Sequence, residues 1–187
     1  MREARTMKEE YIYRYNSPIG VLTVVSDGIN ITGLWIKNPK YNGNTRKIEV
    51  DADDLSVFLV TRDWLDCYFR GKEPDFMPPV KLEGTPFRIS VWKILSEIPY
   101  GKVITYGDIA KKIENQTGKA KMSSQAVGGA VGSNPVSIIV PCHRVVGAGG
   151  NLTGYGSGLD IKSYLLKLEG LDMNRFYLPL KAKGNGI

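Results

Sequence analysis

The only histidine of the chain, His143, directly follows a cysteine, Cys142. A thiolate is a strong nucleophile, but a free cysteine has a pKa of about 8.5, so at neutral pH it needs a base or a positive charge nearby. An imidazole can act as that base, and a carboxylate usually orients it. Glu169 is a candidate, although sequence spacing alone does not establish a contact. The pair indicates an activated thiol, and a purely structural pair is the alternative.

The residues before this pair predict how it is held. Val136 to Val140 is a run rich in branched apolar residues, which is typical of a buried extended segment. Pro141 then interrupts the run. Neighbouring side chains on an extended backbone point to opposite faces, so a direct Cys–His hydrogen bond requires a bend or a bridging water. We therefore expect a bend at Pro141.

A glycine-rich stretch, 147–158, follows the pair. Glycine permits positive φ, so this backbone could wrap a flat ligand, and a mobile surface loop is the alternative. The stretch lacks the lysine and hydroxyl residue that complete a phosphate-binding loop. Two cysteines and one histidine do not make a Cys2His2 zinc site. We expect no metal and no cofactor.

Positive charge is concentrated in the second half of the chain. Residues 1–83 carry 12 Lys and Arg against 13 Asp and Glu, whereas residues 84–187 carry 13 against 6. A basic half suits a polyanion, nucleic acid first, and an unspecific basic surface is the alternative. No apolar run reaches the roughly 18 residues of a membrane span, and the charged first ten residues do not resemble a signal peptide. Two cysteines are expected to be free thiols in a reducing cytoplasm.

The first half reads as a small sheet with a helix. Strand-like runs at 11–15, 21–25 and 29–36 are joined by short turns and predict an antiparallel meander. Asp54 is expected to cap a helix whose apolar positions run from Leu55 to Phe69 with helical spacing. Cys67 falls within this helix, and we interpret it as a structural residue.

The second half reads as helical. Thr85 and Pro86 start one helix, and Thr105 with Asp108 starts another by a capping box. After a polar loop at 114–122, Ser123 or Ser124 caps a helix over 125–132, and a last helix covers 159–169. Two short helices joined by a turn in a basic half indicate a helix-turn-helix.

The second of these two helices is unusual because it carries three glycines, Gly128, Gly129 and Gly132, and only one long polar side chain, Gln125. Each glycine costs about 1 kcal/mol of helix stability relative to alanine. Such a helix cannot read several base edges in a major groove. It suits close approach of its backbone to a minor groove, or tight packing against another helix.

Taken together, these motifs closely resemble those of the O6-alkylguanine-DNA alkyltransferases, also called methylated-DNA–protein-cysteine methyltransferases. The most specific match is PCHRVVG at 141–147. Four further motifs match in order: IPYGKVITYGDIA at 98–110, QAVGGAVGSNP at 125–135, LTGYGSG at 152–158 and KSYLLKLEG at 162–170. The match covers about 100 residues of the second half. In residues 1–83 it rests on architecture and on the SPIG turn at 17–20.

The resemblance implies an α+β protein of two domains. Residues 1–83 would form a ribonuclease-H-like antiparallel sheet with a helix, and residues 84–187 a mostly α-helical domain with the helix-turn-helix. The family binds double-stranded DNA that contains O6-alkylguanine, flips the lesion (O4-alkylthymine also) out of the duplex, and transfers the alkyl group irreversibly to a cysteine. A monomeric, cytoplasmic, single-turnover protein that needs no membrane is expected.

The resemblance also implies roles for individual residues. Cys142 is the acceptor, His143 the base that acts through water, and Glu169 its orienting partner. Asn134 corresponds to the asparagine hinge that braces the helix-turn-helix against the active-site turn. Tyr106 corresponds to the tyrosine that pushes the phosphate and protonates the departing guanine. The remaining implied residues are carbonyls that read the guanine amino group (Cys142, Val145), pocket residues (Tyr155, Gly156, Ser157) and DNA-binding residues (Lys121, Ser124, Gln125, Ala126, Gly128, Gly129, Arg144).

Three features, two single residues and one loop length, depart from the family pattern. Gln125 stands where the family has an arginine that fills the space of the flipped base. The loop between Tyr106 and Gln125 is longer, and it places Lys119 and Lys121 before the recognition helix. Ser157 stands where a glycine is common. A lesion-binding module without transfer is a second hypothesis, which the presence of Cys142 disfavours, and a cysteine hydrolase is a third.

Overall fold

A computed structural model describes residues 9–36, 46–118 and 121–178. Lys119 therefore lies outside the described residues. Contacts divide the chain into two compact units. The first extends to Ile89 and also takes Asn134–Val140, and the second takes Ser90–Ser133 and the residues from Pro141 onward. The segment before Cys142 thus belongs with the first half, a grouping that a single boundary at 83/84 does not express.

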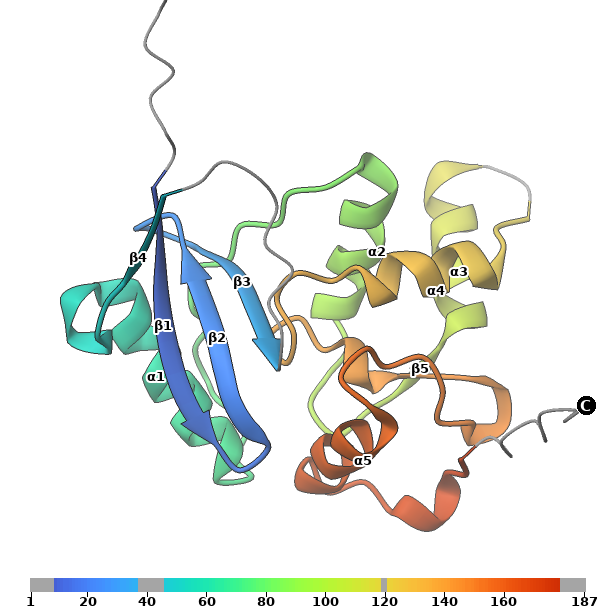
Figure 1. Ribbon diagram of the computed structural model, residues 1–187. Helices are drawn as coiled ribbons and strands as arrows, with labels where there is room; N and C mark the ends of the chain where they lie inside the picture. The colour runs from blue at the N-terminus through green and yellow to red at the C-terminus, as the bar shows by residue number, and fades with distance from the viewer. Residues whose placement is uncertain (1–8, 37–45, 119–120, 179–187) are drawn as a thin grey trace, which may run out of the picture. The chain divides into compact units, whose positions relative to one another are not determined.

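The first unit contains a four-stranded sheet in the order β3-β2-β1-β4 (Figure 1). Strands β1 (Glu9–Ser17), β2 (Gly20–Ser26) and β3 (Ile31–Ile36) pair antiparallel, so the predicted meander is confirmed. Strand β4 (Arg46–Glu49) pairs parallel to β1 and was not predicted. Three of its four residues are charged, so it lacks the composition of a strand.

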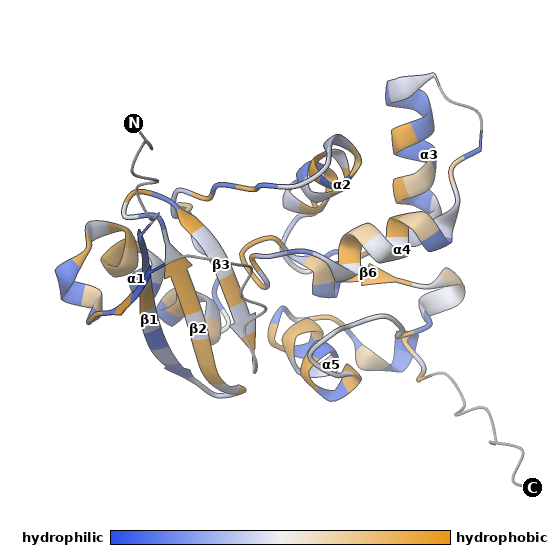
Figure 2. Cartoon of the chain, turned by 45° about the horizontal axis from the view of Figure 1, so that its top comes forward, coloured by the Kyte–Doolittle hydropathy of each residue, from blue (hydrophilic) through white to orange (hydrophobic). Residues whose placement is uncertain are grey.

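Helix α1 (Ser56–Phe69) packs against β1 and β2 through its buried face. The hydrophobic colour along β2 in Figure 2 marks the strand with the most buried residues. The predicted cap at Asp54 is wrong. The helix begins after Leu55 without a side-chain cap, and the Asp54 carboxylate accepts a hydrogen bond from the Asp51 amide in a preceding 3-10 turn, η1 (Ala52–Asp54).

The second unit is mainly helical. Helix α2 (Pro86–Ser96) begins in the first unit and continues into the second, and α3 (Tyr106–Thr117), α4 (Ser124–Gly132) and α5 (Leu159–Leu168) lie wholly in the second. Two-residue strands β5 (Ile104–Thr105) and β6 (Val145–Val146) pair in parallel. Two further 3-10 turns are η3 (Ala148–Gly150) and η4 (Met173–Arg175). Helix α3 extends three residues past Glu114, into the predicted loop, and ends at Gly118 with φ of 65°.

Helices α3 and α4 pack against each other, as the predicted helix-turn-helix requires. The capping box between Thr105 and Asp108 is present, and Ser123 caps α4 by accepting a hydrogen bond from the Gln125 amide. The Trp92 indole on α2 donates to the Ala130 carbonyl at 2.8 Å, which fixes the inner side of α4. None of the helices in the described ranges is both long and apolar enough to cross a membrane.

Candidate active site

The segment that leads to Cys142 is buried, as predicted, but it is extended only in part. Val136, Ser137 and Val140 form β-bridges, and a turn lies between them at 138–139. Ile138 has φ of +70°, a left-handed conformation that is costly for a β-branched residue. The Ile139 amide donates to the Ser137 carbonyl at 2.9 Å, and the Val140 amide donates to the Val136 carbonyl at 3.0 Å. Ile138 itself is 1% exposed. Burial, these backbone hydrogen bonds and a short bridge between Val136 and Leu34 of β3 hold the turn in place.

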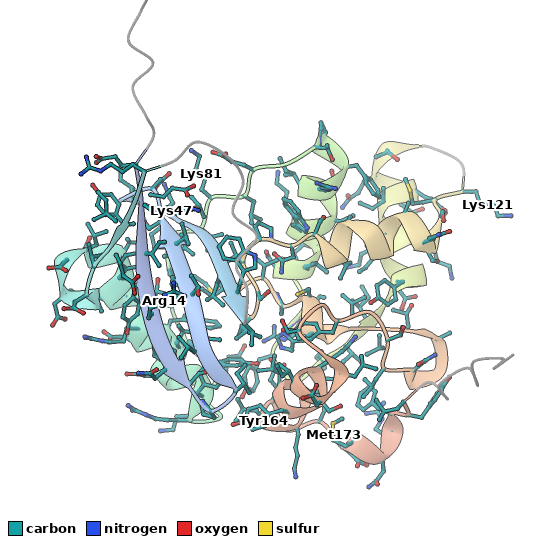
Figure 3. All side chains as sticks on the ribbon, in the orientation of Figure 1. Arg14, Lys47, Lys81, Lys121, Tyr164 and Met173 are labelled. Carbon is teal, nitrogen blue, oxygen red and sulfur yellow. The ribbon has the colours of Figure 1, made fainter. Side chains whose placement is uncertain are left out.

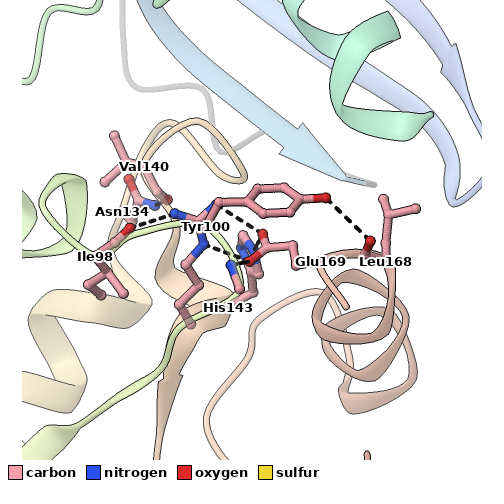
Figure 4. Close-up of polar contacts among 9 residues, drawn as sticks. Ile98, Tyr100, Asn134, Val140, His143, Leu168 and Glu169 are labelled. Carbon is pink, nitrogen blue, oxygen red and sulfur yellow. Dashed lines mark hydrogen bonds and ion pairs between the residues drawn. The ribbon is translucent and has the colours of Figure 1, made fainter. Parts of the chain in front are cut away.

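Asn134 braces the same turn from its start (Figure 4). Its side-chain oxygen accepts a hydrogen bond from the Val136 amide at 3.1 Å, and its side-chain nitrogen donates to the Val140 carbonyl at 2.8 Å. Asn134 is itself buried. The last carbonyl before Pro141 therefore has a fixed direction where the chain enters the Cys–His pair.

The expected bend follows Pro141. Residues Cys142–Arg144 form one 3-10 turn, η2, and both Cys142 and His143 are buried. On this turn the two side chains are no longer constrained to the opposite faces of a strand. Cys142 is only 6% exposed. A substrate group must therefore enter the protein to reach the thiol.

Glu169 does contact His143, which sequence spacing could not establish (Figure 4). The histidine Nε2 lies 2.6 Å from Oε1 of the carboxylate. The same carboxylate accepts from two guanidinium nitrogens of Arg144, at 2.9 and 3.0 Å, and from the Gly101 amide at 3.2 Å. One carboxylate at the C-terminal end of α5 thus holds two side chains and one backbone group.

The protonation states follow from this arrangement. Burial acts to raise the pKa of Glu169, but the hydrogen bonds and charges of His143 and Arg144 outweigh it and lower the pKa to about 2. Burial lowers the pKa of His143, against the opposing effect of Glu169. A neutral imidazole beside an ionised carboxylate donates its Nε2–H to it, so the acceptor nitrogen of the ring is Nδ1.

Arg144, for which a DNA-binding role is expected, lies inside this cluster. Arg144 is 8% exposed, and besides Glu169 its Nη1 donates to the Ile98 carbonyl at 2.6 Å. Its guanidinium also lies 5.6 Å from the ring centre of Tyr100, whose hydroxyl donates to the Leu168 carbonyl. In this structure the guanidinium is therefore engaged by groups of the buried cluster, and its DNA-binding role stays a prediction.

Lys162 is a member of this cluster that sequence reasoning missed. It lies on α5 with 0% exposure, and its Nζ donates to the Val145 carbonyl at 2.5 Å and to the Thr153 carbonyl at 2.7 Å. A signal was present in the sequence. Lys162 precedes Leu165 and Leu166 by three and four residues, so helical spacing places it on the buried face.

Tyr106 and the glycine-rich stretch also meet. The Tyr106 hydroxyl lies 3.2 Å from the Thr153 carbonyl and 3.3 Å from that of Gly154, to which it can donate. Burial, helped by the charge of Cys142, raises the pKa of Tyr106 to about 12. Gly154 has φ of +69°, and a Cβ there would lie 2.4 Å from the Tyr106 oxygen. Glycine is therefore required at this position.

The other predicted pocket residues follow directly in the chain. The Tyr155 hydroxyl is buried without a hydrogen-bond partner among the described residues, and burial together with the charge of Cys142 raises its pKa. Gly156 is exposed and Ser157 half-buried, both ahead of α5. A buried hydroxyl and an exposed glycine, which leaves room for a ligand, are compatible with a pocket wall.

The predicted DNA-binding residues of α4 lie together on its outer side. Ser124, Gln125, Ala126 and Gly129 are exposed, and Gly128 is half-covered by the Tyr106 ring. A Cβ at Gly129 would meet no described atom within 4 Å, and the same holds for Gly132. Packing against another described helix therefore does not explain these two glycines.

Lys121 stands just before this helix and is exposed, with a φ of 49°. Its side chain extends outward from the chain in Figure 3.

No group of three or more His, Cys, Asp or Glu side chains in the described ranges could hold a metal ion. The structure therefore brings Cys142, His143 and Glu169 together with Arg144 and Lys162, and it leaves the α4 residues as a separate exposed surface.

Comparison with known proteins identifies this arrangement. The model described as "6-O-methylguanine DNA methyltransferase, ribonuclease-like domain" matches residues 11–82, and the "DNA binding domain" model of the same name matches residues 86–171. A methylated-DNA–protein-cysteine methyltransferase of Haemophilus influenzae is 43% identical over 85% of this chain and 86% of its own length. The protein of that name from Methanosarcina acetivorans is 45% identical over 86% of this chain and 98% of its own length.

Solved structures agree. The crystal structure of Mycobacterium tuberculosis OGT in complex with DNA matches with a TM-score of 0.74 and 38% identity, over 89% of this chain and 94% of that one. The two domain models lie end to end along the chain, and the identities extend over both. The chain belongs to the 6-O-methylguanine DNA methyltransferase family.

Proposed function

We propose that this protein repairs alkylated DNA by direct reversal, taking the alkyl group of O6-alkylguanine onto Cys142. The observation that carries the proposal is a buried thiol next to a neutral imidazole, whose other nitrogen is held by an ionised carboxylate. Family membership supports this chemistry, since the relatives are named for methyl transfer from DNA to a protein cysteine.

The proposed transfer balances without a cofactor. The Cys142 proton passes to Nδ1 of His143 through a water, the thiolate attacks the alkyl carbon, an S–C bond forms and the C–O6 bond breaks. The guanine leaves as an anion and takes a proton from Tyr106. Tyr106 then regains, through water, the proton that His143 took from Cys142. The product is a thioether, and no neighbouring group has the chemistry to cleave it, so each molecule reacts once.

Substrate recognition is assigned to backbone and loop groups. The carbonyls of Cys142 and Val145 accept from the guanine amino group, while Tyr155, Gly156 and Ser157 line the pocket. Asn134 keeps the peptide before Pro141 in place, because its amide holds the Val140 carbonyl. A base can reach a thiol with so little exposure only when it leaves the stack, so base flipping is part of the proposal.

Double-stranded DNA is the proposed partner, and the outer side of α4 its proposed contact. The glycines at 129 and 132 leave the helix backbone open to a minor groove, with Gln125 at the position that fills the gap left by the flipped base. We place the chemistry in residues 84–187 and a supporting ribonuclease-like domain in residues 1–83. A free thiol acceptor suits a reducing cytoplasm, and a monomeric protein is part of the proposal.

Mass spectrometry of the protein after incubation with a duplex containing O6-methylguanine tests the proposal. We expect one methyl group on the Cys142 peptide and no second turnover. Cys142→Ala should abolish transfer while retaining DNA binding, and Cys67→Ala, on α1, is the matched control that should transfer normally. Tight binding with an unmodified Cys142 would favour a lesion-binding module, and repeated turnover would favour a hydrolase.

A further inference from the structure

The complete burial of Lys162 calls for an explanation, because lysine is among the residues least often fully buried. Within the described residues no Asp or Glu forms an ion pair with it, and its Nζ donates to two neutral carbonyls. Burial lowers the pKa of Lys162 to about 8, so the side chain is still mostly charged at neutral pH. A buried ammonium without a carboxylate is costly, so a purely structural role is a poor account of it.

The two carbonyls that Lys162 holds both take part in the proposed reaction. The Val145 carbonyl is the acceptor assigned to the guanine amino group, and a carbonyl oxygen can accept a second hydrogen bond. The Thr153 carbonyl also lies 3.2 Å from the Tyr106 hydroxyl. The Lys162 ammonium therefore links the Val145 carbonyl, which would accept from the guanine, to the Thr153 carbonyl, which holds the Tyr106 hydroxyl.

The charge of Lys162 also lies close to the nucleophile in the fold, because its Nζ holds the carbonyl of Val145, the residue that directly follows the turn Cys142–Arg144. An ammonium and a thiolate each favour the charged form of the other, and the same ammonium disfavours protonation of His143. These two effects work in the same direction. They keep the imidazole neutral, able to take a proton, and they favour the ionised thiol.

We propose that Lys162 is a positioning residue of the transfer site, which sets the Val145 and Thr153 carbonyls and provides the counter-charge of the Cys142 thiolate. The part that concerns guanine rests on the proposed function. The part that concerns the thiol does not, because it requires no DNA. The two parts are therefore tested by separate measurements.

The first measurement compares two substrates. Lys162→Met keeps the length and apolar stem of the side chain but removes the charge and the donors. Single-turnover methyl transfer is measured from duplexes with O6-methylguanine and with O6-methylhypoxanthine, which lacks the 2-amino group. We expect a loss of about tenfold or more with guanine, the value of one hydrogen bond, and a smaller loss with hypoxanthine. Equal losses, or none, would overturn the positioning role.

The second measurement follows the thiol alone. Cys142 is alkylated with iodoacetamide over a range of pH, in Cys67→Ala backgrounds so that one thiol reports. We expect the profile of Lys162→Met to shift to higher pH, since the counter-charge is gone while His143, Glu169, Arg144, Tyr106 and Tyr155 are unchanged. Lys167→Met, an exposed lysine on the same helix, is the control and should not shift. An unshifted Lys162→Met profile overturns the counter-charge role.

Near-ultraviolet circular dichroism checks that the variants fold. If Lys162→Met does not, Lys162→Gln decides, because it keeps a polar donor without the charge and should still shift the thiol profile. Failure of the wild-type protein to transfer from either duplex would defeat the proposed function. The iodoacetamide profile then decides the Lys162 proposal by itself.

Discussion

Two regions of the second unit differ in whether their side chains are engaged with other groups of the chain. In the buried cluster, Glu169 alone accepts from His143, Arg144 and the Gly101 amide. On the outer side of α4, by contrast, positions 129 and 132 carry no side chain, and a Cβ added at either would meet no described atom beyond the helix's own backbone. One region is completed by the chain itself, and the other is left bare for a partner to cover.

The difference separates two physical tasks. A group that must react needs a fixed protonation state and direction, and buried charged hydrogen bonds provide both at a cost in desolvation. A surface that must approach a polymer needs to be free of protruding side chains, at a cost in helix stability. Four substitutions or conditions test this contrast.

The largest effect is expected from Glu169→Gln. Removing this charge leaves the Arg144 guanidinium buried without its carboxylate, so the free energy of unfolding should fall by about 3–5 kcal/mol. Urea denaturation measures it. Glu97→Gln, at an exposed glutamate after α2, is the control and should change stability by less than about 0.5 kcal/mol. A Glu169 variant as stable as this control would remove the basis for calling the cluster preorganised.

The fall of the unfolding free energy at acid pH should reveal the same carboxylate, Glu169. Because the pKa of Glu169 is lowered to about 2 in the folded protein, the residue stabilises the fold above its unfolded value of 4.5. That contribution, about 3 kcal/mol, is lost as pH falls from about 4.5 towards 2. Unfolding free energies at several pH values should fall more steeply for the wild type than for Glu169→Gln. Parallel curves would show that Glu169 has an ordinary pKa.

A smaller and opposite pair of effects is expected on α4. Gly129→Ala should stabilise the protein by about 0.5–1 kcal/mol, since a methyl group there meets nothing in the described structure. The same methyl group should weaken DNA binding, measured by fluorescence anisotropy. The control is Val60→Ala on α1, which also raises helix propensity. It should leave DNA affinity unchanged. Unchanged affinity in Gly129→Ala would show that the bare face does not touch DNA.

The smallest effect concerns charge at the edge of that face. Gln125→Arg should raise DNA affinity and steepen the plot of log affinity against log salt by about 0.9 for one added phosphate contact. Gln125→Met, of similar length and uncharged, separates charge from bulk and should keep the original slope. If the arginine variant shows the original slope too, residue 125 makes no phosphate contact.

Signals that act over a few residues allowed much of the fold to be predicted. The meander follows from turns at Gly20 and Gly28, and the helix-turn-helix from the caps at Thr105 and Ser123. Each depends on neighbours within about four positions of the chain. Strand β4 was missed because its pairing with β1, rather than its composition, makes it a strand.

The motifs PCHRVVG and KSYLLKLEG contain all five residues of the buried cluster, but they indicate a role in the transfer only for Cys142, His143 and Glu169. The contacts of Arg144 and Lys162 depend on distant partners. Arg144 meets a carbonyl 46 residues earlier, and Lys162 meets one 17 residues earlier. Charged residues are normally exposed, and a prediction from sequence starts from that expectation. The buried Arg144 and Lys162 contradict it.

The turn before Cys142 limits how far this protein can be shortened. The Ser137 amide donates to the Leu34 carbonyl, and the Leu34 amide to that of Pro135, so strand β3 is the partner of the segment that precedes the thiol. A fragment beginning at residue 84 would keep every motif named for the reaction and lose this support. We therefore expect the catalytic half to be less stable alone than in the full chain. Truncated or fused versions should keep the N-terminal sheet, even though none of the proposed site residues lies on it.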